Sequence, residues 1–206
     1  MKRWLPWLIA STVWLGGAVF GLILMFRYQT APGTAAAPPP RWPAASRIER
    51  TPGKATLVMT VHPQCPCTRA SMGELALLMA RCQDQMKANV LFLKPSGFGD
   101  EWVKSDLWTS AARIPGVTVL RDDNGEEAKR FHAATSGETV LYDADGKLLF
   151  SGGITSGRGH SGDNAGRTAI VSLLSGGGSN CHGTFVYGCS LVNPINVSTQ
   201  SICCKK

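Results

Sequence analysis

The sequence predicts an α/β fold with a mixed central sheet, preceded by one apolar N-terminal helix. Three features predict it: an uncharged stretch near the amino terminus, an alternation of strand-like and helix-like segments after residue 50, and a hairpin signal followed by a last helix. The chain has 206 residues, of which 44% are hydrophobic, so it is long enough for one globular domain with extensions.

Residues 4–26 contain no charged side chain. A helix rises about 1.5 Å per residue, so this stretch exceeds the roughly 30 Å hydrocarbon core of a bilayer and predicts a transmembrane anchor over residues 1–28. The alternative is a cleaved signal peptide, because Lys2 and Arg3 precede the stretch and small residues follow it at 34–37. The length of the stretch favours the anchor.

Lys2 and Arg3 predict that the amino terminus lies in the cytoplasm, which makes the chain a single-pass protein of the cytoplasmic membrane. The rest of the chain would then face the periplasm or the cell exterior. Residues 29–50 are rich in proline and alanine without apolar periodicity, so we expect an extended spacer. The globular domain is expected over residues 51–175, followed by a cysteine-containing tail over residues 176–206.

The formal net charge of +7 raises nucleic acid as a partner. All 14 acidic residues lie between Glu49 and Asp163, and the basic excess lies near the two ends of the chain. Phosphate binding requires basic side chains that cluster on a folded face. The sequence therefore predicts no nucleic-acid partner.

The segments after residue 50 alternate in pattern. Strands are expected at residues 55–61, 90–94, 117–121, 138–143 and 147–152, and helices at about residues 66–86, 102–113, 125–134 and 165–174. Ala144-Asp145-Gly146, between the last two strands, is typical of a hairpin turn. Parallel strands joined by helices and then a hairpin predict the mixed sheet.

The first strand leads directly into His62-Pro63-Gln64-Cys65-Pro66-Cys67, so both cysteines are expected at the start of a helix. A helix N-terminus lowers the pKa of a cysteine from about 8.5 to between 3.5 and 7.5, and the thiolate is the form that attacks disulfides. Nearby His62 and Arg69 are expected to add positive charge. We therefore expect redox chemistry, with Cys65 attacking and Cys67 resolving.

This order of elements, with a cysteine motif after the first strand, resembles the thioredoxin-like fold. Three motifs, 62–71, 152–155 and 158–164, are similar to those of bacterial membrane-anchored RedB-type proteins, and the likeness covers about residues 50–192. The expected activity is thiol–disulfide oxidoreduction, without a cofactor, on protein or small-molecule thiols and disulfides.

Two departures from the thioredoxin pattern limit that resemblance. The cysteines are separated by one residue rather than two, and a disulfide across one residue would close a tight, easily reduced ring. Gly137 stands where most thioredoxin-like folds place a cis-proline that faces the cysteines. The division of roles between Cys65 and Cys67, and the way substrates dock, do not transfer from thioredoxins.

Other residues have weaker signals. Arg158 and His160 lie in a glycine-rich loop that such a fold places beside the cysteines, although a plain connecting loop is the alternative. Cys82 has helical spacing typical of core packing. Cys181 and Cys189 are expected to form a structural disulfide.

Two alternative functions remain. Soft thiolates and imidazoles bind Cu(I), so Cys65 and Cys67 with His62, His132 or His160 predict a copper-binding protein, although the expected Cys-x-x-x-Cys spacing is absent. Cys65-Pro66 is also similar to the peroxiredoxin Cys-Pro, which predicts a peroxide reductase that forms a sulfenic acid.

Overall fold

The computed structural model describes residues 4–34 and 36–191. The chain divides into two compact units, Met1–Ala31 and Pro32–Lys206. The first unit contains helix α1 (Leu5–Thr30), which has a mean hydropathy of 2.1 over its most apolar window and buries none of its residues. Among the described helices it is the one long and apolar enough to cross a membrane.

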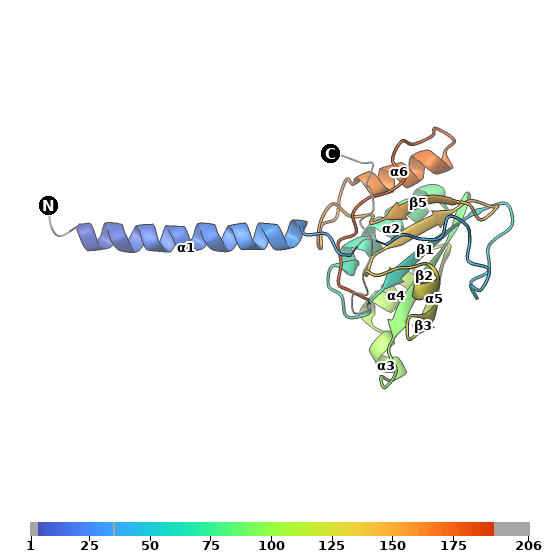
Figure 1. The fold of residues 1–206 in the computed structure, drawn as a ribbon, viewed down its shortest axis with the longest axis horizontal. Helices are drawn as coiled ribbons and strands as arrows, with labels where there is room; N and C mark the ends of the chain where they lie inside the picture. Colours follow the sequence, from blue (N-terminus) through green and yellow to red (C-terminus); the bar gives the residue numbers. More distant parts are fainter. Residues whose placement is uncertain (1–3, 35, 192–206) are drawn as a thin grey trace. The chain divides into compact units, whose positions relative to one another are not determined.

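The second unit contains a five-stranded sheet in the order β3-β2-β1-β4-β5 (Figure 1). Strands β1 (Ala55–Val61), β2 (Met86–Lys94) and β3 (Val117–Asp123) are parallel. Strands β4 (Thr139–Tyr142) and β5 (Leu148–Gly152) form the expected hairpin, and β4 pairs antiparallel with β1. The mixed sheet predicted from the sequence is confirmed.

Helices fill the connections between strands. They are α2 (Thr68–Cys82), α3 (Asp100–Val103), α4 (Asp106–Ala112), α5 (Glu126–Arg130) and α6 (Ala165–Leu174). The single helix expected around residues 102–113 is two short helices, because Ser105 adopts an extended backbone and starts α4. Both α4 and α6 pack against α2, so these three helices share one side of the sheet.

The two faces of the sheet have different coverings. Alternate residues of β1, such as Leu57 and Met59, face the main core, where they meet the buried side chains of α2, α4 and α6. Cys82 lies in this core, as its spacing predicted. Val58 faces the other way, into a smaller cluster that includes Ile48 and Phe131. Part of the segment before the domain therefore covers the second face.

The segment expected to be a spacer packs on the domain. Trp42 makes edge contacts with the rings of Phe131 and Tyr142, at centroid distances of 5.1 and 5.2 Å. The Tyr142 hydroxyl donates a hydrogen bond to the Pro39 carbonyl at 2.9 Å, and the Ser46 hydroxyl bonds the buried Glu127 at 2.8 Å. These residues therefore cover the sheet instead of standing free of it as a spacer.

The tail returns across the domain as far as Leu191. Gly183 forms a parallel bridge with Ser151, and Ser190 forms an antiparallel bridge with Thr135. Cys203 and Cys204 lie outside the described residues. The described tail thus ends beside the segment that leads into β4.

Candidate functional site

The strand-to-helix junction places both motif cysteines at the start of α2. The N–H of Cys65 donates to the His62 carbonyl at 3.0 Å, and the N–H of Thr68 donates to the Cys65 carbonyl at 3.2 Å, so the motif is a turn that winds into the helix. Cys67 is the residue immediately before α2. Both side chains are buried, with exposed fractions of 1% and 8%. The positive end of the helix dipole favours a thiolate here.

A sulfur from the tail lies next to that of Cys65. The Sγ atoms of Cys65 and Cys189 lie 3.0 Å apart, although 124 residues separate them in the sequence. Both are free thiols, so the disulfide expected between Cys181 and Cys189 is wrong: the tail turns Cys189 toward the motif. Cys181 is disulfide-bonded in the structure, while the other described cysteines are free.

Backbone hydrogen bonds hold Cys189 in this place. The N–H of Ser136 donates to the Cys189 carbonyl at 2.8 Å, and the N–H of Leu191 donates to the Ala134 carbonyl at 2.9 Å. Gly188 lies so close to Ser136 that a Cβ atom on it would collide with the Ser136 carbonyl oxygen. Sequence reasoning missed this pairing, because a short bridge between distant segments leaves no periodic signal.

Hydrogen bonds aimed at Cys65 stabilise its thiolate. Burial alone would raise its pKa, but the Thr68 hydroxyl, the Cys189 thiol and the N–H groups of the same two residues outweigh burial and lower the pKa of Cys65 to about 7. The Thr68 hydroxyl is itself bonded to the Ser136 hydroxyl at 2.7 Å. Ser136 in turn accepts the N–H of His62 at 2.8 Å, so a chain of donors ends on the Cys65 sulfur.

The other two thiols near Cys65 hold their protons more tightly. Burial raises the pKa of Cys189 to about 12, and its hydrogen bond to Cys65 and the negative charge of Cys65 add to the effect. Burial and the Cys65 charge also raise the pKa of Cys67, while the Arg158 guanidinium acts against them. Cys65 is therefore the most acidic of these three thiols and is partly ionised at neutral pH, whereas Cys67 and Cys189 stay protonated.

Comparison with known proteins gives likenesses of structure only. No family model matches the chain, and no curated protein matches it by sequence. The chain is similar to a hypothetical protein from Sinorhizobium meliloti, with a TM-score of 0.58 and 20% identity over 78% of this chain and 93% of that one. It is similar to an uncharacterized conserved protein from Geobacillus kaustophilus, with a TM-score of 0.56 and 18% identity over 82% and 95%.

A secreted disulfide oxidoreductase of Mycobacterium tuberculosis gives a TM-score of 0.43 and 14% identity over 61% of this chain and 83% of that one. In the present chain a parallel β1-α2-β2 unit adjoins the antiparallel β4-β5 hairpin, α6 follows the hairpin, and the cysteine motif lies between β1 and α2. The chain has a thioredoxin-like fold.

Gly137 departs from the usual thioredoxin-like arrangement, as its sequence position indicated. Its φ is +88°, a left-handed conformation that favours glycine, and the described residues contain no cis peptide bond. Its N–H donates to the Thr60 carbonyl at 2.7 Å. The neighbouring Ser136, rather than a proline, contacts both the motif and the tail.

Arg158 is the loop residue that reaches the motif cysteines. Its guanidinium hydrogen-bonds the Cys67 sulfur and donates to the Gly188 carbonyl at 2.6 Å, so it connects the motif to the tail. The loop is anchored to α2 through the buried Glu74, which accepts the N–H of Gly162 at 2.7 Å and pairs with Arg167.

The remaining predicted residues make other contacts. His62 accepts the N–H of Gln64 through Nδ1, and burial lowers its pKa, which disfavours the positive charge expected of it. Arg69 forms an exposed ion pair with Asp106. His160 is exposed, and its Nδ1 is bonded to the Arg158 carbonyl oxygen at 2.9 Å.

The copper-binding alternative requires a set of metal ligands. In residues 4–34 and 36–191, no group of three or more His, Cys, Asp or Glu side chains is placed to hold a metal ion. The Nδ1 of His132 is bonded to the Ala37 carbonyl oxygen at 2.7 Å.

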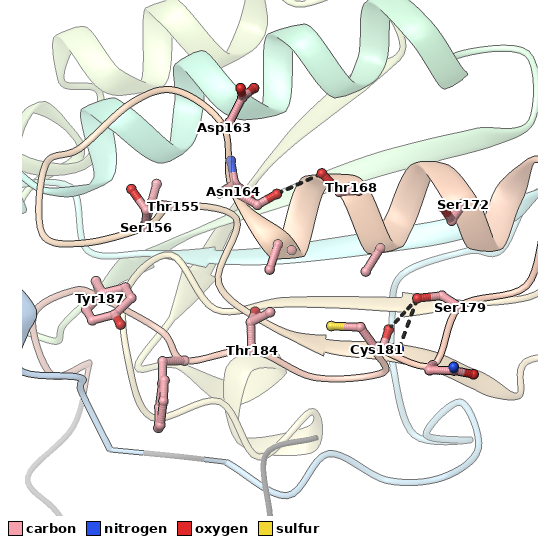
Figure 2. A pocket seen from close by; sticks show the side chains of 15 residues that line it. Thr155, Ser156, Asp163, Asn164, Thr168, Ser172, Ser179, Cys181, Thr184 and Tyr187 are labelled. Atoms are coloured by element: carbon pink, nitrogen blue, oxygen red, sulfur yellow. Dashed lines mark hydrogen bonds between the residues drawn. The ribbon is translucent and has the colours of Figure 1, made fainter. Parts of the chain in front are cut away.

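A pocket of about 660 Å³ lies between the start of α6 and tail residues 179–187 (Figure 2). The described residues that line it include Cys181 but not the motif cysteines.

Proposed function

We propose that this chain is a membrane-anchored thiol–disulfide oxidoreductase whose reactive group is the Cys65 thiolate. One observation carries the proposal: the Cys65 sulfur receives hydrogen bonds from Thr68 and from the Cys189 thiol 3.0 Å away, which lower its pKa to about 7. A stabilised thiolate beside a second thiol is the arrangement that disulfide exchange requires. No cofactor takes part, since the electrons pass between sulfur atoms.

The reaction moves two electrons between the protein and its substrate. In the oxidising direction, a substrate thiolate attacks a protein disulfide that contains Cys65, forms a mixed disulfide and releases one protein thiolate. A second substrate thiolate then attacks the mixed disulfide, so the substrate leaves as a disulfide and the protein is left as a dithiol. The reducing direction reverses both steps. A leaving thiolate of low pKa accelerates the first step, and Cys65 meets that condition.

We place this activity outside the cytoplasmic membrane. Helix α1 is long enough to span a bilayer, and the arrangement of Lys2 and Arg3 before it favours an amino terminus in the cytoplasm. Disulfides persist in oxidising compartments, which fits both the disulfide-bonded Cys181 and the seven cysteines of the chain. The RedB-type assignment rests on the three sequence motifs.

The activity is tested with the full-length protein in detergent micelles. We expect the protein to catalyse reduction of insulin by dithiothreitol and to equilibrate with glutathione through a reversible internal disulfide. Cys65→Ser should abolish both activities. Cys82→Ser, which alters a core thiol away from the site, should preserve them. Equal activity of wild type and Cys65→Ser would refute the proposal.

The same preparation addresses the two alternative functions. A stoichiometric Cu(I) site that is lost in Cys65→Ser would support the copper-binding alternative. Consumption of hydrogen peroxide with a trapped sulfenic acid at Cys65 would support the peroxide reductase. Disulfide exchange without either result supports the oxidoreductase.

A further inference from the structure

We propose that the redox-active disulfide joins Cys65 to Cys189, and that substrate thiols enter through the Cys189 sulfur while Cys67 remains a thiol. The inference rests on the proposed function and identifies its second catalytic residue. Cys189 lies in the tail, far from the motif in sequence, so the site would be assembled from both ends of the domain. The described tail then has a catalytic role rather than a structural one.

The first support is the placement of Cys189. Its thiol and its backbone N–H both donate to the Cys65 sulfur, and the two sulfurs are 3.0 Å apart. A disulfide has an S–S distance of about 2.05 Å, so closing the bond requires the sulfurs to approach by about 1 Å. The hydrogen bonds from Ser136 to Cys189 and from Leu191 to Ala134 already hold the backbone in that position.

The second support is the geometry of Cys67. Only Pro66 separates it from Cys65, and the chain is winding into α2 at this point. The Cys67 sulfur is itself hydrogen-bonded to Cys65, but a disulfide ring closed across one proline is strained. Arg158 also hydrogen-bonds the Cys67 sulfur. Ring strain therefore disfavours a disulfide between Cys65 and Cys67 relative to one between Cys65 and Cys189.

The third support is the difference in access between the two sulfurs. Cys65 is 1% exposed, whereas Cys189 is only partly buried. An external thiolate can therefore reach Cys189 more readily than Cys65. Attack on Cys189 makes Cys65 the leaving group, and a thiolate with a lowered pKa leaves faster.

The electrons balance in two steps. A substrate thiolate bonds to the Cys189 sulfur, the Cys65–Cys189 bond breaks, and Cys65 leaves as a thiolate that Thr68 stabilises. A second substrate thiolate then bonds to the first substrate sulfur, and Cys189 leaves and takes up a proton. The substrate loses two electrons and the protein gains them. An external disulfide, such as oxidised glutathione, restores the protein disulfide by the reverse exchange.

The pairing is tested on the full-length wild-type protein in detergent. The protein is oxidised with oxidised glutathione, its free thiols are alkylated, and the peptides are analysed by mass spectrometry. We expect a Cys65–Cys189 disulfide and an alkylated Cys67. A predominant Cys65–Cys67 disulfide would overturn this pairing but would remain consistent with the proposed oxidoreductase function. Absence of any reversible disulfide and of insulin reduction would overturn both.

Matched serine variants supply an independent test. Cys67→Ser should keep most of the turnover, whereas Cys189→Ser should lose about tenfold or more, because a tethered thiol is replaced by one from solution. Cys65→Ser, incubated with a mixed-disulfide reagent, should carry the adduct on Cys189. The reverse ranking of Cys67→Ser and Cys189→Ser would contradict the pairing. An adduct found on Cys67 instead of Cys189 would contradict the entry route.

Discussion

The hydroxyl oxygens of Thr68 and Ser136 lie 2.7 Å apart, although one residue opens α2 and the other precedes β4. Ser136 accepts the N–H of His62, so its own hydrogen is free to point toward Thr68. Thr68 then directs its hydrogen to the Cys65 sulfur. The fold thus connects two neutral hydroxyl groups in series to a buried thiolate.

Removal of the Thr68 hydroxyl should raise the pKa of Cys65. We expect Thr68→Val to raise it by about one to two units, because a hydrogen bond to a charged group contributes about 1.5–3 kcal/mol. The pH dependence of iodoacetamide alkylation at Cys65, followed by mass spectrometry, measures the change. Thr68→Ser keeps the hydroxyl and should keep a midpoint near 7. Equal midpoints in both variants would show that the hydroxyl does not stabilise the thiolate.

Trp42 should stabilise the domain although it lies in the predicted spacer. Its ring contacts Phe131 and Tyr142 on the second face of the sheet. Trp42→Ala should lower the free energy of unfolding by about 2–3 kcal/mol, below the usual range for a fully buried tryptophan because Trp42 is only half-buried. Urea denaturation measures the change, and Trp42→Phe should lose less than half as much. No loss in Trp42→Ala would mean that the segment is a spacer after all.

The contrast between this segment and the strands shows which features the sequence encodes locally. Each of residues 55–61 is apolar or β-branched, and they form β1 with the predicted bounds. The turn after them starts α2 close to Cys67, as the proline and the apolar spacing indicated. Such patterns depend on neighbouring residues, so one sequence suffices to find them.

Contacts between distant segments had no such signal. Nothing local distinguishes Cys189 from Cys181, and seven cysteines allow many pairings. Only the folded sheet brings Ser136 to the tail and so directs Cys189 to Cys65. Trp42 likewise lies in a proline-rich stretch without periodicity, and it packs on Phe131 and Tyr142, which are distant in sequence. Contacts between segments distant in sequence therefore determine the positions of both Cys189 and Trp42.

Glu138 should make the domain less stable as the pH rises. Burial raises the pKa of its carboxyl group from 4.5 to about 7, so the folded state binds this proton more tightly than the unfolded state. Between these two values the unfolded chain releases the proton first, and stability falls by up to about 3 kcal/mol. The contribution of neutral Glu138 is complete below pH 4.5 and is lost as the pH rises through 7.

Glu138→Gln tests that pH dependence. The amide oxygen can still accept the Ala134 N–H, which Glu138 accepts at 3.1 Å. The free energy of unfolding of the variant, measured in urea from pH 4.5 to 8, should fall less steeply than that of the wild type. Glu101→Gln, on the surface of α3, is the control and should follow the wild type. Parallel profiles for wild type and Glu138→Gln would contradict the assignment.

Gly188→Ala should separate Cys189 from Cys65. The added Cβ would collide with the Ser136 carbonyl oxygen and lie 3.3 Å from the Thr135 side chain, so the tail must shift. Overpacking of this kind costs about 1–3 kcal/mol. We expect a lower melting temperature and a lower yield of the Cys65–Cys189 disulfide at a fixed glutathione ratio.

Gly73→Ala is the matched control for this shift, because Gly73 lies in α2 with open space around its Cβ position. Alanine is favoured over glycine inside a helix by about 0.8–1.0 kcal/mol, so this variant should melt at a higher temperature and keep its disulfide yield. Gly188→Ala and Gly73→Ala add the same methyl group, and only the former places it against the backbone that positions Cys189. If both variants retain the full disulfide yield, contact between Gly188 and Ser136 does not determine the position of Cys189.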